Sequence, residues 1–63
     1  MPRLSADVLY EMLLEIKHND PNHDFNSLDL LSIGDVTAQF QQLVETGKVI
    51  EHHDIVGSFE VVG

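Results

Sequence analysis

Hydrophobic residues recur at helical spacing near the start of the chain, and residues typical of helix ends flank them. Over residues 5–18 the charged side chains fall largely on the opposite side from the apolar ones. The apolar stripe consists of Val8, Leu9, Met12, Leu13 and Ile16. Ser5 is a suitable N-cap, and Pro21 disfavours helical geometry in the residue before it. We therefore predict a helix over residues 5–18.

A second segment with helical spacing follows Ser32. Ser32 and Asp35 have the spacing of a capping box, with Asp in place of the usual Glu or Gln. The apolar stripe here consists of Val36, Phe40, Leu43 and Val44. Gly47 suits the left-handed position that follows many helices. These signals predict a helix over residues 33–46.

The segment between the two helices allows two interpretations. Residues 20–24 are predicted to form a loop. Ser27 could cap a short helical turn over residues 28–31, or Phe25 could begin a brief strand. In either case we expect Phe25 and Leu28 to reach the core.

The C-terminal segment is rich in β-branched residues and predicts an antiparallel hairpin. Its strands are expected over residues 48–53 and 58–62, joined by a turn over 54–57. The alternation of Phe59 and Val61 with polar neighbours predicts one inward, apolar face. The last strand is expected to leave an open edge.

Ile55 and Val56 are unexpected residues for a hairpin turn, because turns favour Gly, Asn, Asp and Pro. Either the turn is displaced and one of the two packs inward, or both form an exposed apolar tip. An exposed tip would suit docking against another protein or a second copy of the chain.

The composition indicates one small domain spanning residues 1–63, since 43% of its 63 residues are hydrophobic. The chain has no cysteine, so neither a disulfide nor a thiolate metal site can stabilise so small a core. The lack of cysteines, of a signal-peptide pattern and of a long apolar run predicts a cytoplasmic protein with no membrane contact.

The second half of the chain resembles the winged-helix superfamily, in which a capped recognition helix leads into a β-hairpin wing. The matching positions are Ser32, Val36, Phe40, Leu43, Gly47, Val49 and Ile50. The resemblance covers residues 31–62 and, less closely, 5–18, but residues 20–30 depart from it where the family has a full second helix. It implies a small α+β domain ordered helix, short element, helix, C-terminal β-hairpin. In DNA-binding members the recognition helix enters the major groove.

The charge of the chain opposes that DNA-binding role. Eleven acidic residues outnumber Arg3, Lys17 and Lys48, which gives a formal net charge of −8. Nucleic-acid affinity depends on neutralised phosphates, yet no exposed position of the second predicted helix carries Lys or Arg. We therefore expect a protein partner, with a basic one favoured, and candidate contacts at Asp35, Thr37, Gln41, Glu45, Asp54, Ile55 and Val56.

Catalytic and metal-binding patterns are weak. Glu11 and Glu15 lie one helical turn apart, which is more typical of a solvated surface than of an acid–base pair. His18 and His23 with Asp20 and Asp24 lack the spacing of a zinc site, and the adjacent His52 and His53 are expected to point to opposite faces of a strand. We predict no catalytic residue, no cofactor and no metal ligand, and hence no enzyme.

The sequence therefore favours a non-enzymatic, acidic protein-interaction module with a regulatory role. It could form a homodimer through its C-terminal strand or the hairpin tip. One alternative is a DNA-binding transcriptional regulator that acts as a dimer. Another is a small metal- or ligand-binding domain.

Overall fold

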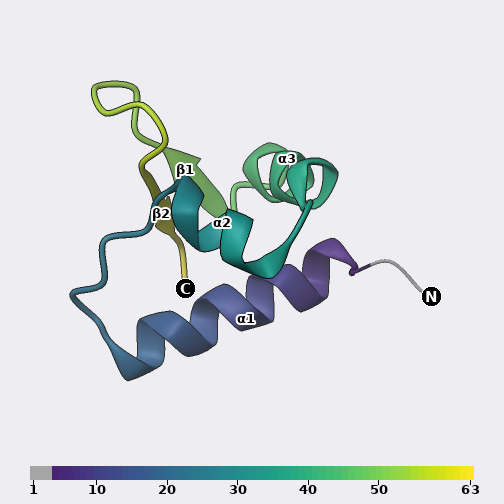
Figure 1. Cartoon of the computed structure of the whole chain (residues 1–63), viewed down its shortest axis with the longest axis horizontal. Helices are drawn as coiled ribbons and strands as arrows, with labels where there is room; N and C mark the ends of the chain where they lie inside the picture. Colours follow the sequence, from purple (N-terminus) through teal and green to yellow (C-terminus); the bar gives the residue numbers. More distant parts are fainter. Residues whose placement is uncertain (1–3) are drawn as a thin grey trace.

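A long helix, α1 (Ala6–Asn19), runs along one side of the molecule, at the bottom of Figure 1. The computed structural model describes residues 4–63. The helix begins where the Ser5 hydroxyl accepts a hydrogen bond from the Val8 amide at 3.2 Å. It ends before Asp20 and Pro21, and the Asp20 amide still donates to the Ile16 carbonyl at 2.9 Å. The predicted helix over residues 5–18 is confirmed, together with its cap.

The buried face of α1 differs from the predicted stripe. Leu9 and Leu13 are fully buried, but Val8 is 44% and Met12 37% exposed. The residues that extend the buried face toward the core are Ala6, Tyr10, Leu14 and Ile16. On this face Tyr10 is partly buried and donates its hydroxyl proton to the Val62 carbonyl. An amphipathic side chain can cover the core and still keep its polar end hydrogen-bonded.

The second helix, α2 (Ser27–Ile33), corrects the predicted position of the capping box. The Asn26 side chain accepts from the Leu28 amide at 2.9 Å, and Asp29 accepts from the Asn26 amide at 2.9 Å. Asn26 and Asp29 have the same three-residue separation as Ser32 and Asp35, so they form the reciprocal cap one segment earlier. Ser32 lies inside α2 and donates its hydroxyl to the Asp29 carbonyl at 2.7 Å. The expectation that Ser32 caps a helix is therefore wrong.

The third helix, α3 (Thr37–Glu45), is shorter than the predicted helix over residues 33–46. Gly34, at a φ of 138°, ends α2, and α3 begins after Val36 without a side-chain cap. The end of α3 follows the prediction, because Gly47 has a φ of 76°. The Gly47 amide donates to the Val44 carbonyl at 3.1 Å and the Lys48 amide to the Leu43 carbonyl at 2.9 Å. These two bonds form the Schellman motif that terminates many helices.

The chain ends in the predicted antiparallel hairpin of β1 (Val49–Glu51) and β2 (Phe59–Val61). Its strands are shorter than predicted, although bonds from the His52 amide to the Ser58 carbonyl and from the Val62 amide to the Lys48 carbonyl extend the pairing. Phe59 and Val61 are buried and Glu60 is exposed, as the alternation predicts.

The outer edge of β2 is occupied, contrary to the expected open edge at the C-terminal strand. The Phe59 amide donates to the Phe25 carbonyl at 3.2 Å, and Asn26 forms a single antiparallel bridge with Ser58. Lys17 covers the Val61 carbonyl from α1 with a hydrogen bond of 2.7 Å. The segment before α2 thus begins with a trace of strand and continues as a helix, so each of the two interpretations is realised in part.

The core lies between α1, α3 and the inward face of the hairpin. Its buried members are Leu9, Leu13, Phe25, Val36, Leu43, Val49, Phe59 and Val61. Phe25 reaches this core as predicted, but Leu28 is 71% exposed and does not. Among the helices of residues 4–63, none combines the length and the apolar composition needed to cross a bilayer.

The corrected cap can be tested by two alanine substitutions. We expect Asn26→Ala to lower the free energy of unfolding by about 0.5–2 kcal/mol, because it leaves the first amides of α2 without an acceptor. Ser32→Ala should change it by less than about 0.5 kcal/mol, as for an exposed residue outside a cap. Urea denaturation followed by circular dichroism measures both, and the reverse ranking would restore Ser32 as the cap.

Candidate functional site

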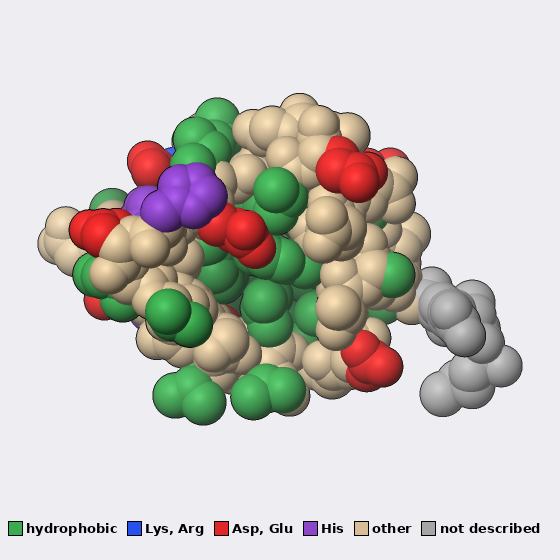
Figure 2. Space-filling model, turned by 90° about the horizontal axis from the view of Figure 1, so that it is seen from above, with side chains coloured by type: hydrophobic (Ala, Val, Ile, Leu, Met, Phe, Trp, Pro, Cys, Tyr) green, Lys and Arg blue, Asp and Glu red, His purple; other side chains and the backbone are tan. Residues whose placement is uncertain are grey.

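An apolar groove lies between α2, α3 and the loop over residues 52–58, and we call it the α2–α3 groove. It consists of two adjoining lobes that share Ser27, Leu30 and Phe40. The lobe between α2 and the start of α3 has a volume of about 410 Å³, and its apolar wall consists of Leu30, Leu31, Val36 and Phe40. The lobe beside the hairpin has a volume of about 370 Å³ and adds Val56 and Phe59. Figure 2 shows apolar side chains in the floor of a hollow whose rim carries acidic and histidine side chains.

The floor of the groove is fixed by aromatic packing. Phe59 is buried, and its ring meets Phe40 edge-on, with centroids 4.9 Å apart and planes at 67°. On its other side Phe59 packs against Phe25 at 5.5 Å. Phe40 is only partly buried, so it connects the rigid core to the open groove. The floor of the groove is therefore continuous with the packed core.

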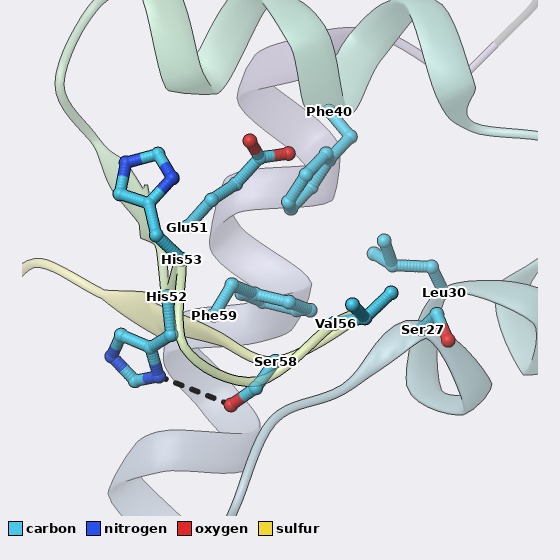
Figure 3. A pocket seen from close by; sticks show the side chains of 10 residues that line it. Ser27, Leu30, Phe40, Glu51, His52, His53, Val56, Ser58 and Phe59 are labelled. Carbon is cyan, nitrogen blue, oxygen red and sulfur yellow. Dashed lines mark hydrogen bonds between the residues drawn. The ribbon is translucent and has the colours of Figure 1, made fainter.

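Each lobe also contains one exposed carboxylate. Glu51 lies directly opposite Phe59 in the hairpin, so both side chains share the face of the sheet that points to the core. Figure 3 shows the Glu51 carboxylate directed toward Phe40 in the lobe beside the hairpin. Asp35 lines the other lobe and accepts a hydrogen bond from the Thr37 hydroxyl at 3.1 Å. Within residues 4–63 neither carboxylate has an ion-pair partner.

Both lysines of the described chain are engaged elsewhere. Lys17 donates to the carbonyls of Val61 at 2.7 Å and Gly63 at 3.3 Å. Lys48 lies 3.5 Å from Asp7 and above the ring of Tyr10, at 5.2 Å from its centroid. Neither lysine lines either lobe of the groove. Among the described residues the groove therefore contains two carboxylates, Asp35 and Glu51, together with His52 and His53 in the lobe beside the hairpin, but no lysine.

The structure brings together only part of the set of contacts expected from the sequence. Asp35, Thr37 and Val56 line the groove. Gln41, Glu45, Asp54 and Ile55 are exposed but line neither lobe. Ile55 is 59% exposed and Val56 fully exposed, so the hairpin loop has an apolar tip and neither residue packs inward.

Sequence reasoning missed most of the residues that line the groove, among them Leu30, Leu31, Phe40, Glu51 and Phe59. One available signal was the capping-box spacing of Asn26 and Asp29, which places three leucines on a short helix. A helix of seven residues cannot bury leucines on all sides, so an apolar exposed surface follows. Leu28 and Leu31 are both 71% exposed, but only Leu31 lines the groove.

The histidines form separate pairs and do not cluster. His23 lies 3.1 Å from Asp29 and His52 lies 3.1 Å from the Ser58 hydroxyl. His18 is exposed, as are Glu11 and Glu15 on α1. Across residues 4–63 no three His, Asp or Glu side chains gather in a way that could hold a metal ion.

Comparison of the chain with models of known protein families, with curated proteins and with solved structures finds no match. The winged-helix resemblance therefore stays a prediction from the sequence. What the structure provides toward function is the α2–α3 groove and its charges.

Proposed function

We propose that this chain is a non-enzymatic protein-interaction module whose α2–α3 groove binds an apolar segment of a protein partner, and that its role is regulatory. The observation that carries the proposal is an open apolar groove in which each lobe contains one carboxylate without an ion-pair partner among residues 4–63. Binding sites are typically concave and mostly apolar, with a few polar groups that orient the ligand. Exposed apolar surface of this kind commonly marks a protein-interaction site.

The charge of the groove favours a protein over DNA. If the winged-helix resemblance holds, α3 occupies the place of the recognition helix, and yet Thr37–Glu45 contains no Lys or Arg. Thr37 and Phe40 of this helix line the apolar groove. A duplex would bring phosphates close to Asp35 without gaining a cationic contact there, which opposes binding. A protein partner with apolar side chains gains binding free energy by burying them in the same groove.

Two leucines on α2 provide a matched test of the proposal. Leu31→Asp places a charge in the groove, whereas Leu28→Asp places the same charge on an equally exposed position outside it. We expect peptides selected from a displayed random library on the unmodified domain to bind Leu31→Asp at least about tenfold more weakly, the effect of losing about 1.4 kcal/mol. Binding to Leu28→Asp should stay within about twofold, and fluorescence anisotropy measures both.

Titration with duplex oligonucleotides tests the alternative, that the chain binds DNA. The proposal predicts no mobility shift at low salt. Duplex binding that weakens steeply as salt rises would support the DNA-binding regulator instead, because it reports released counterions. Selected peptides that bind Leu28→Asp and Leu31→Asp equally would also contradict the proposal.

A further inference from the structure

We infer that the segment held in the α2–α3 groove is an amphipathic helix whose apolar stripe is flanked by Lys or Arg. This inference rests on the proposed function and adds the conformation and the charge of the partner. It follows from three properties of the groove: the positions of its carboxylates, the hydrogen bonding of its walls and its division into two lobes.

The carboxylates determine the charge of the partner. Glu51 and Asp35 lie in different lobes, so a bound segment meets a negative charge along both parts of its path. An acidic or phosphorylated segment would meet a like charge in both lobes and would find no lysine there, since Lys17 and Lys48 make their contacts elsewhere. Only the lobe beside the hairpin offers it the imidazoles of His52 and His53. A segment with Lys or Arg beside its apolar residues pairs with both carboxylates. The net charge of −8 speeds the encounter with such a basic partner.

The walls of the groove favour a helix over an extended strand. A strand needs partners for its backbone amides and carbonyls, because such groups are costly to bury unpaired. The outer edge of β2 cannot supply them, since Phe25 and Asn26 already occupy it. Of the hydroxyls that line the groove, those of Ser58 and Thr37 are engaged with His52 and Asp35, and the single hydroxyl of Ser27 cannot pair the backbone of a whole strand. A helix satisfies its own backbone and presents only side chains to the apolar wall.

The division of the groove into two lobes suits a partner that presents apolar side chains along one face of a helix. Helices that bind in apolar grooves insert residues at positions i, i+3 or i+4, and i+7. Here Leu30 and Phe40 lie between the lobes, with Leu31 and Val36 on one side and Val56 and Phe59 on the other. One apolar residue in each lobe, spaced by one or two helical turns, would contact both sets of walls.

The probe for this inference is a synthetic amphipathic peptide of about 16 residues, long enough to form helix in isolation. It carries Leu at i, i+3 and i+7 and Lys beside the stripe. We expect a peptide with Glu in place of every Lys to bind at least about tenfold more weakly. A peptide with Pro at its centre should lose at least about tenfold as well, because proline breaks the helix.

Two substitutions that change the net charge equally distinguish the effect of the charge in the groove from the effect of the net charge of the domain. Glu51→Lys reverses a charge inside the groove, and Glu45→Lys reverses one on α3 outside it. We expect Glu51→Lys to weaken binding of the Lys peptide about tenfold and Glu45→Lys about twofold or less, since exposed pairs outside the contact contribute little. Circular dichroism of each variant verifies that its fold is intact.

The outcomes distinguish this inference from the proposed function. If the Lys and Glu peptides bind equally well and Leu31→Asp still abolishes binding, the groove docks a protein but the inferred charge of the partner is wrong. If Glu45→Lys and Glu51→Lys weaken binding of the Lys peptide equally, the peptide responds to the net charge of the domain and not to the carboxylate in the groove. Undiminished binding of the Pro peptide would overturn the helical conformation. Equal binding to Leu28→Asp and Leu31→Asp would overturn the proposed function itself.

Discussion

Leu13→Ala is expected to lower the free energy of unfolding by about 2–5 kcal/mol, because it removes a fully buried side chain and leaves a cavity. A domain of 63 residues has a small core, and such cores supply only about 3–5 kcal/mol. The loss is therefore comparable to the whole stability. We expect a large unfolded fraction at 25 °C without denaturant, measured by circular dichroism and urea titration.

Met12→Ala is the matched control, since Met12 is the neighbouring residue on the same helix. The predicted stripe placed both residues in the core, but Met12 is 37% exposed and Leu13 is not exposed at all. We expect the Met12 substitution to cost less than about 1 kcal/mol, as is usual at positions outside the core. Equal losses at the two positions would mean that the core meets the face of α1 predicted from the sequence.

The comparison between these two residues shows what the sequence of α1 could determine. Ser5 and Pro21 act locally, so they set the ends of the helix without reference to the rest of the chain. The direction of the buried face depends on Tyr10 and on its contact with Val62, a residue 52 positions away. Tyr10 carries a polar group and lies outside the predicted apolar stripe. Hydrophobic spacing alone therefore identified the helix but misplaced part of its face.

The boundary between α2 and α3 was mispredicted for a related reason. Two possible capping boxes, at Asn26–Asp29 and Ser32–Asp35, have the same spacing and cannot both begin a helix so close together. The choice depends on a tertiary contact, because Asn26 is also held by its bridge to Ser58. The end of α3 needed no such information, since Gly47 adopts its positive φ through local bonds to Leu43 and Val44.

The groove could be predicted in its charge but not in its shape. The acidic excess is visible in the sequence, and it agrees with a groove that no Lys or Arg of residues 4–63 lines. The side chains that form the groove come from α2, α3 and the segment between them, and from both strands and the loop of the hairpin. Their meeting depends on where the hairpin packs against the helices, which no local pattern encodes. Glu51 belongs to the site only because its strand pairs it with Phe59.

Phe59→Ala is expected to have a comparably large effect, about 3–5 kcal/mol in the free energy of unfolding. Phe59 contacts both Phe25 and Phe40, and its amide bonds to the Phe25 carbonyl. Truncation of its ring would leave a cavity between β2 and the two aromatic residues. It would also remove the floor of the groove, so we expect both the urea midpoint and the near-ultraviolet circular dichroism signal to fall.

Phe59→Leu separates the loss of volume from the loss of aromatic packing. Leucine keeps an apolar side chain at this position but removes the edge-on contact with Phe40 at 67° and the tilted contact with Phe25 at 33°. Such aromatic pairs contribute about 0.5–1.5 kcal/mol each beyond their buried area. We therefore expect Phe59→Leu to lower the free energy of unfolding by about 1–3 kcal/mol. This is less than for Phe59→Ala, because leucine keeps most of the floor of the groove. Equal losses in the two variants would show that ring geometry, and not filled volume, holds β2 against the helices.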